Sequence, residues 1–165
     1  MPAAPREHWL VFRFVADRTL DYLPLDGLVE APANPREHRL DVLGESVTRF
    51  GYVEPIVLDE RSGRIVSGHG RRRELLARRE RGEAAPDGIQ VDGDGRWLVP
   101  VVRGWASKDD AESAGYLVAA NRTTELAVWQ PAGLSELLAD LAATDLGLEG
   151  IGFTSGDLDE LLVQV

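Results

Sequence analysis

Residues 55–81 constrain the fold of this chain more than any other stretch. The apolar runs 55–59 and 64–67 flank Glu60-Arg61-Ser62-Gly63, a pattern typical of a β-hairpin. The second run leads through Ser67-Gly68-His69-Gly70 into a helix predicted over 70–81. A strand, a glycine turn and a helix in direct succession predict a domain in which a sheet packs against helices.

The glycine turn has the composition of an anion-binding loop. Gly68 and Gly70 permit positive φ and a close approach of backbone to ligand, and a helix start presents unpaired N–H groups with partial positive charge. Of the three arginines that follow, Arg71 is the best phosphate ligand and Arg72 the second, because consecutive helical residues point in different directions. His69 is a candidate acid, base or ligand. The alternatives are a glycine-bounded turn before a solvated basic helix, with His69 as a hydrogen-bond partner.

Acidic and basic residues are distributed unevenly along the chain. The formal net charge is −10 with a pI near 4.7, which argues against binding nucleic acid by bulk electrostatics. Residues 61–81 nevertheless hold eight arginines against two glutamates, a local charge of +6, while residues 123–165 hold eight acids and no Lys or Arg. We therefore expect one anion-seeking surface, the Arg61–Arg81 basic patch, on an acidic body.

Other classes of protein are disfavoured by what the sequence lacks. There is no cysteine, which excludes disulfides, thiolate metal sites and cysteine nucleophiles. There is no long uncharged apolar run and no secretory signal, so we expect a cytoplasmic protein without a membrane partner.

The remaining chain alternates predicted strands, loops and helices. Strands are predicted at 8–15 and 97–102, extended chain at 21–28, loops at 31–36 and 82–96, and helices at 39–50, 107–121, 134–141 and 157–162, the last capped by Ser155. This order predicts an α+β core over 1–105 and a helical C-terminal extension over 106–165 that packs on it.

These segments resemble the N-terminal domain of the ParB/sulfiredoxin superfamily. The resemblance rests on Asn34-Pro35-Arg36, the helix after it, Gly51-Tyr52-Val53-Glu54-Pro55-Ile56-Val57, Ile65-Val66-Ser67-Gly68-His69-Gly70-Arg71 and Val99-Pro100-Val101-Val102. The segment 119–129 around Asn121-Arg122, with Gly152-Phe153-Thr154 and 157–161, is similar to ParB-like proteins found beside phage and prophage DNA methylases. The resemblance implies a small mixed sheet flanked by helices.

The resemblance also implies nucleotide-phosphate binding by the glycine loop and the helix after it. The expected ligand is a nucleoside triphosphate, CTP or ATP, with Mg²⁺. The implied ligand-facing residues are Gly68, His69, Gly70, Arg71, Arg72, Arg36, Asn121, Arg122 and Glu54. Asn121 is implied as a metal or phosphate contact, with a helix C-cap as its alternative, and Glu54 as a general base or metal ligand, with an exposed carboxylate as its alternative. Arg36 is either a second phosphate clamp or a surface arginine.

Departures from the family patterns narrow the chemistry. Sulfiredoxins carry a cysteine in this loop, and this chain has none. Partition proteins carry Gly-Glu-Arg-Arg, whereas His69 and Gly70 stand here at the positions of the Glu and the first Arg. A carboxylate that would help to hold magnesium is thus missing, and the short acidic remainder leaves no room for a helix-turn-helix domain.

Three functions remain open at this point. The first is a nucleotide-binding module in phage, plasmid or DNA-modification processes, with DNA contacted through the basic patch. The second is an enzyme of the same fold, a metal-dependent nuclease, a nucleotide hydrolase or a small-molecule kinase using His69 and Glu54. The third is an interaction protein or homodimer whose leucine face at 134–141 docks on a partner, although packing of that face on the protein's own core is favoured.

Overall fold

The structure is a computed structural model that describes residues 17–32 and 34–164. A mixed sheet runs in the order β1-β6-β3-β4-β2, and β5 pairs with β6 beside this path. The strands are β1 (Thr19–Pro24), β2 (Val29–Glu30), β3 (Ile56–Asp59), β4 (Arg64–Ser67), β5 (Gln90–Val91) and β6 (Trp97–Trp105). The predicted strand at 8–15 lies outside the described residues.

The hairpin of β3 and β4 forms as the sequence predicts. The two strands pair antiparallel, with Leu58 opposite Ile65, and Gly63 closes the turn at φ +65 while its N–H donates to Asp59 O at 2.8 Å. The long strand β6 then pairs parallel to β3 on one side and antiparallel to β1 on the other. The sheet is mixed because a helix separates β4 from β6, and this crossover lets β6 pair parallel to β3.

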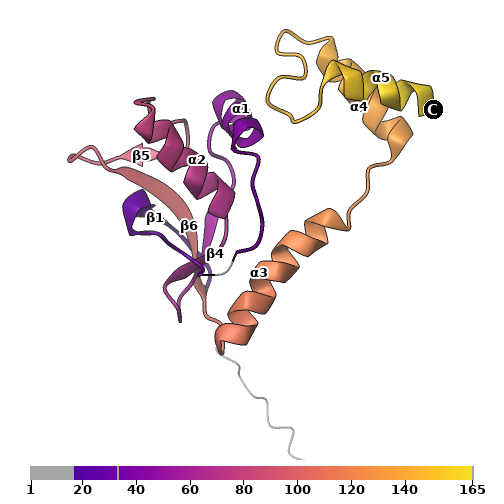
Figure 1. Ribbon diagram of the computed structural model, residues 1–165. Helices are drawn as coiled ribbons and strands as arrows, with labels where there is room; N and C mark the ends of the chain where they lie inside the picture. Colours follow the sequence, from indigo (N-terminus) through magenta and orange to yellow (C-terminus); the bar gives the residue numbers. More distant parts are fainter. Residues whose placement is uncertain (1–16, 33, 165) are drawn as a thin grey trace, which may run out of the picture.

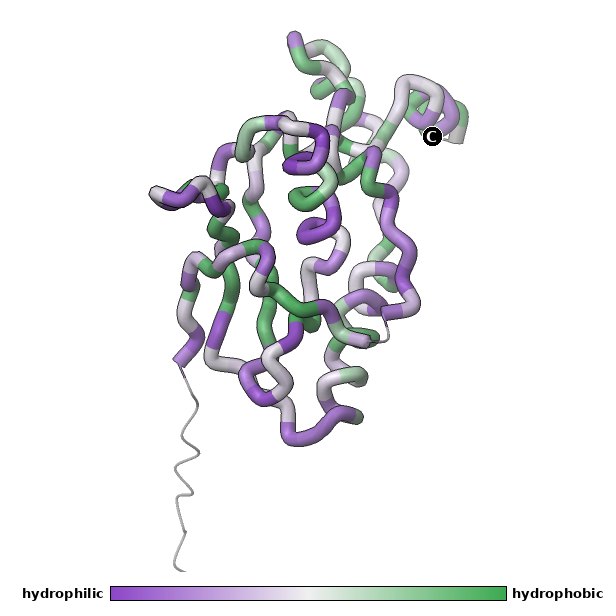
Figure 2. The backbone as a smooth tube through the Cα atoms, turned by 60° about the vertical axis from the view of Figure 1, so that its left-hand side comes forward, coloured by the Kyte–Doolittle hydropathy of each residue, from purple (hydrophilic) through white to green (hydrophobic). Residues whose placement is uncertain are grey.

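The core lies on the face of the sheet that α1 (Leu40–Phe50) and α2 (His69–Glu80) cover (Figure 1). Its members are apolar residues from β3, β4, β6, α2 and the turns beside them: Leu25, Leu28, Tyr52, Ile56, Leu58, Ile65, Leu75, Trp97, Val99 and Val101. Figure 2 shows hydrophobic residues along these central strands as well as on the helices. Burial of this set supplies the main driving force of folding.

A buried carboxylate joins the end of β3 to the segment after β6. Asp59 is fully buried and accepts hydrogen bonds from the backbone N–H and the hydroxyl of Ser107, each at 2.8 Å, and from the Ser62 hydroxyl at 2.7 Å. Burial alone would raise the pKa of Asp59, but these hydrogen bonds, with one from the Arg61 N–H, lower it to about 2. The network fixes the point at which the chain leaves the sheet.

Three helices follow that point. α3 (Asp110–Glu125) begins at an Asp109 cap, whose side chain accepts the Glu112 N–H, and its Leu117 is buried where the helix contacts β4. α4 (Pro131–Ala142) and α5 (Ser155–Gln164) then pack on each other. In Figure 1 α3 leads away from the end of the sheet and α4 and α5 lie beyond it.

The segment between α4 and α5 reaches back to α1. Arg49 Nη1 donates to the carbonyl oxygen of Gly147 at 2.8 Å and to that of Glu149. Gly150 lies so close that a Cβ there would be 2.8 Å from the carbonyl oxygen of Glu45. The Arg49 guanidinium and the close approach of the Gly150 and Glu45 backbones thus join this segment to α1.

Element types agree with the sequence analysis, whereas several boundaries differ. The expected loop 82–96 contains β5, β6 continues to Trp105, and α3 extends four residues past Asn121. Thr154, not Ser155, caps α5, because its hydroxyl accepts the Asp157 N–H at 3.2 Å while Asp157 Oδ2 accepts the Thr154 N–H at 2.6 Å. Of the predicted leucine face, Leu134 and Leu138 are buried and Leu137 is exposed. No described helix has the length and apolarity needed to cross a membrane.

Candidate functional site

The glycine turn places the start of α2 against the sheet and α1. Gly68 is in the left-handed region at φ +96, and a Cβ there would lie 2.9 Å from Ile56 Cγ1. Gly70 is already helical, and a Cβ there would lie 2.8 Å from the imidazole of His38. The first glycine is therefore required by its backbone conformation, as the sequence predicts, whereas the second is required by the approach of a side chain rather than by a positive φ.

The N-terminus of α2 carries no side-chain cap among the described residues. The first intrahelical bond there runs from Arg72 N–H to Gly68 O at 2.9 Å. The N–H groups ahead of Arg72 lack helical acceptors, as in every α-helix, and the helix dipole adds partial positive charge at this end. This is the geometry of an anion site, although such geometry alone does not identify one.

A second observation distinguishes this helix end from an ordinary one. Five of the seven buried side-chain nitrogens without a hydrogen-bond partner in the described part of the chain lie in the first turn of α2 or in the segment before α1: Asn34 Nδ2, His38 Nε2, His69 Nε2, Arg71 Nε and Arg72 Nε. The other two are Arg49 Nε and Arg78 Nε. His69 is only 3% exposed. An unsatisfied buried polar group costs about 1–3 kcal/mol, so a cluster of them is the mark of a missing partner.

Both histidines of this cluster are held neutral. Burial lowers the pKa of His69, and nearby Arg73 lowers it further against the opposing effect of Glu30. Burial, Arg73 and Arg36 likewise lower the pKa of His38. A neutral imidazole offers one donor and one acceptor, so each ring can accept a proton when an anion arrives.

Glu30 on β2 binds two of the loop's arginines. Its carboxylate receives Arg73 Nη2 at 2.6 Å and Arg72 Nη1 at 3.2 Å. Hydrogen bonding from Arg73 lowers the pKa of Glu30, so the carboxylate is ionised at neutral pH. The side chains of Glu30 and Arg72 are 22% and 17% exposed, which makes this a largely desolvated pair.

Arg71 takes a different direction, along the turn before β3. It forms an ion pair with Glu54 and donates to the carbonyl of Pro55 at 3.4 Å, beside the buried phenol of Tyr52. Burial raises the pKa of Tyr52 to about 12 and lowers that of Arg71. The Arg71 side chain is 21% exposed and that of Glu54 is 75% exposed. Arg71 and Glu54 also border a cavity of about 480 Å³ whose apolar wall is α1.

The segment 34–39 connects this cluster to α3. Arg36 Nη1 donates to Asn121 Oδ1 at 3.1 Å and to Glu125 Oε1 at 3.2 Å. Asn121 Nδ2 donates to Leu117 O at 2.8 Å, four residues back within the helix. The C-cap alternative for Asn121 is therefore wrong, because α3 continues through Glu125. Arg36 and Asn121 are brought together, whereas exposed Arg122 points to Glu125 at 3.2 Å.

The basic patch at 61–81 is far less positive in the fold than in the sequence. Arg61 pairs with Asp110, Arg79 with Asp26, and Arg81 with Glu74 and Glu83. Arg78 pairs with Glu83 at 3.1 Å. Much of the positive charge of the patch is therefore paired within the fold, in part by Asp26 and Asp110 from elsewhere in the chain.

Sequence analysis overlooked three participants in the cluster. Glu30 lies on a two-residue strand that no pattern indicated, and His38 lies between the predicted loop 31–36 and the predicted helix 39–50. Tyr52 belongs to the segment 51–57 that resembles the family, and nothing in its local sequence indicated a role at the site. The single available indication was the proximity of His38 to Arg36 along the chain. Among the described residues, no group of three or more His, Asp and Glu side chains could hold a metal ion.

Comparisons with known proteins establish the fold. A scan against family models finds no match, and a search of curated proteins finds no similar sequence. Among solved structures, the chain is similar to the C-terminally truncated chromosome-partitioning protein ParB from Caulobacter crescentus, which was crystallised in complex with CTP-γ-S. The TM-score is 0.50 at 17% identity, over 87% of this chain and 71% of that one. The expected ParB-like α+β fold is thus confirmed.

Proposed function

We propose that this protein binds the phosphates of a nucleoside triphosphate at the Gly68–Gly70 turn. The observation that carries the proposal is the group of partnerless buried nitrogens around an uncapped helix N-terminus. An incoming phosphate would supply acceptors for these donors and a charge suited to the helix dipole. The likeness in fold to a protein crystallised with CTP-γ-S supports a nucleotide as the source of that phosphate.

The position of each residue determines which part of the nucleotide it would contact. The first N–H groups of α2 and the His69 ring would hold one phosphate. Arg71 would hold a second phosphate after its ion pair with Glu54 breaks. This exchange is favourable because Glu54 is largely solvated and its pairing is correspondingly weak. The apolar wall of the cavity beside Arg71, which includes Leu43 and Val47, suits a nucleobase.

Arg36 and Asn121 form the outer part of the proposed site. The Arg36 guanidinium donates hydrogen bonds to Asn121 and Glu125. It would have to release both residues before it could contact the phosphates. Mg²⁺ would arrive with the nucleotide, and Asn121 Oδ1, freed from Arg36, is the oxygen that could contact it. Arg122 remains at the periphery because it is exposed and already paired.

Binding is a better proposal than turnover. Within residues 17–32 and 34–164, no group of three or more His, Asp and Glu side chains could hold a metal ion. A hydrolytic enzyme of the nuclease type usually uses several carboxylates on a metal. No specific observation in the described residues favours nuclease or kinase chemistry over binding.

The test is calorimetric titration with CTP, ATP and GTP, each with Mg²⁺. We expect heat with at least one of them, and a loss of affinity of about tenfold or more in Arg71→Ala, because a charge-assisted bond to phosphate contributes about 1.5–3 kcal/mol. Arg39→Ala is the matched control, since Arg39 is 78% exposed and forms its ion pair with nearby Asp41. Absence of heat with all three nucleotides, or an equal loss in the control, contradicts the proposal.

We further propose that nucleotide binding serves a DNA-related process, such as partition or DNA modification. The support is the likeness in fold to a chromosome-partitioning protein and the resemblance of segment 119–129 to phage-associated relatives. Because the arginines of the basic patch form ion pairs with acids of the same chain, any DNA contact would be local and strongly weakened by salt. A gel-shift titration at two salt concentrations, with and without the nucleotide that binds, checks this role.

A further inference from the structure

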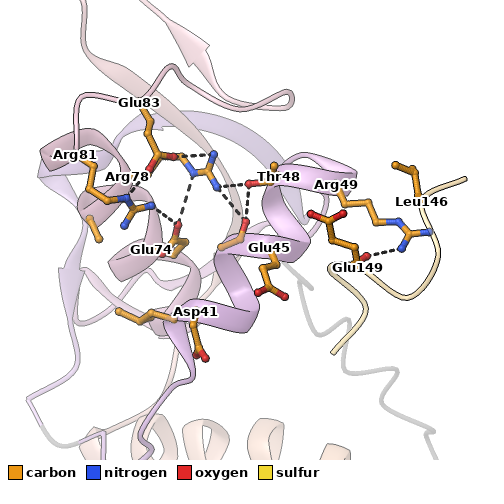
Figure 3. Close-up of a pocket in the computed structure, with 13 residues that line it drawn as sticks. Asp41, Glu45, Thr48, Arg49, Glu74, Arg78, Arg81, Glu83, Leu146 and Glu149 are labelled. Carbon is orange, nitrogen blue, oxygen red and sulfur yellow. Dashed lines mark hydrogen bonds and ion pairs between the residues drawn. The ribbon is translucent and has the colours of Figure 1, made fainter. Parts of the chain in front are cut away.

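A cavity separate from the glycine turn lies between α1, the second half of α2 and the segment after α4. Its volume is about 710 Å³, within the range of small-molecule sites. Figure 3 shows residues from these elements around it, including Glu45 on α1, Arg78 on α2 and Leu146 on the distant segment. Two parts of the chain about a hundred residues apart thus share one cavity.

The distant wall of this cavity is held in place. Arg49 donates to the carbonyls of Gly147 and Glu149, and Gly150 lies close against the backbone of Glu45. Gly150 has φ +71, a conformation that favours glycine. The segment that carries Leu146 and Glu149 is therefore held against α1 by these contacts.

The cationic side chains of the cavity are already engaged. Arg78 donates to Gly44 O at 3.0 Å and to Thr48 Oγ1 at 2.8 Å, and pairs with Glu83, as the dashed lines of Figure 3 show. Arg81 binds the buried carboxylate of Glu74 at 3.1 Å. Both guanidinium groups are therefore ion-paired within the cavity.

The carboxylates of the cavity outnumber its arginines. Its lining includes five carboxylates and three guanidinium groups, an excess of two negative charges. The carboxylates of Glu45 and Glu149 form no ion pair within the described residues, and the carbonyl oxygen of Glu149 accepts a hydrogen bond from Arg49 (Figure 3). Between the charges, the lining is apolar at Leu40, Ala77 and Leu146. Apolar walls with unpaired carboxylates complement a small organic cation.

We propose that this cavity binds a small organic amine, with its apolar body against Leu40 and Leu146 and its ammonium group between Glu45 and Glu149. Because Glu149 belongs to the segment docked by Arg49, such a ligand contacts both parts of the chain. It would hold that segment on α1 more firmly.

The test is a titration of the full chain with tryptamine and phenethylamine, each compared with its neutral hydroxyl counterpart, tryptophol and 2-phenylethanol. We expect the amines to bind at least about threefold more tightly than the alcohols, and to weaken as salt rises from about 0.05 M to about 0.5 M, because the carboxylates are solvent-accessible. The double variant Glu45→Gln/Glu149→Gln should weaken amine binding about three- to tenfold and leave the alcohols unchanged.

The matched control is Glu136→Gln/Asp140→Asn, which removes two exposed acids of α4 outside the cavity. Circular dichroism verifies that each variant folds. Equal binding of amine and alcohol, no binding of any probe, or an equal loss in the control overturns the proposal. Leu146→Ala gives an independent reading, since it should weaken amine and alcohol alike by removing an apolar wall.

Discussion

The Cα of Gly70 faces the imidazole of His38 so closely that a methyl group on Gly70 would lie 2.8 Å from the ring atoms Cγ and Nδ1. The same methyl group would lie 3.0 Å from Leu43 Cδ1 on α1. This packing explains a glycine in the first turn of a helix, and it joins the segment 34–39 to the candidate site.

Gly70→Ala should therefore destabilise the protein by about 1–2 kcal/mol, because overpacking outweighs the gain in helix propensity. Gly115→Ala is the matched control: Gly115 is in α3 with nothing within 4 Å of an added Cβ, so the change should stabilise by roughly 0.5–1 kcal/mol. Urea denaturation measures both. A stabilised Gly70→Ala would show that His38 moves aside without cost.

Glu30→Gln should increase affinity for a nucleotide at the glycine turn. The change neutralises the carboxylate that holds Arg72 and Arg73, and leaves both guanidinium groups available to phosphate. We expect affinity to rise about three- to tenfold and its salt dependence to steepen. Calorimetry at two salt concentrations measures this effect, with Asp110→Asn, which removes the ion-pair partner of Arg61, as control. Weaker binding in Glu30→Gln would mean that Glu30 positions the arginines rather than competing for them.

Nucleotide affinity and protein stability should respond oppositely to mild acid. The pKa values of His69 and His38 are lowered from 6.5 in the folded protein, so their contribution to stability is present above 6.5 and is lost as pH falls through and below that value. A bound phosphate favours the protonated rings, so affinity should rise as pH falls from about 8 to about 6. In His69→Asn the rise should be smaller. An unchanged pH dependence in that variant would exclude His69 from the site.

Acid unfolding should depend on Asp59. Its pKa of about 2 lies below the ordinary 3.8, so its contribution to stability is present above pH 4 and is lost as pH falls through 2. The shift corresponds to about 2 kcal/mol. Asp59→Asn should be destabilised by about 2 kcal/mol at neutral pH, with a shallower loss between pH 4 and 2, in denaturant titrations at each pH. Asp140→Asn, on the exposed side of α4, should behave as the unsubstituted protein does.

Arg49→Met should release the segment after α4 from α1 while leaving the sheet intact. Arg49 provides the hydrogen bonds that join Gly147 and Glu149 to α1. We expect faster proteolysis within 143–153 and little change in the free energy of unfolding of the core. Arg122→Met, which removes an exposed pair within α3, is the control. Equal proteolysis of the two variants would show that other contacts hold the segment.

The sequence by itself determined the local elements around the candidate site. Two apolar runs that flank a turn ending in glycine specify the β3–β4 hairpin. The glycine turn and the basic helix after it specify the junction between β4 and α2. Both features depend on residues that are close along the chain. The positive φ of Gly68 follows from the same local pattern. The α+β class was predictable for this reason.

Only the tertiary structure decided the electrostatics of the site. Glu30 comes from a two-residue strand and binds Arg72 and Arg73 more than forty residues away, so no local count could reveal that the positive charge is neutralised. Likewise, the contact of Arg36 with Asn121 spans 85 residues. Charge pairing depends on distances of a few ångströms between side chains, and those distances follow from how the sheet and helices pack.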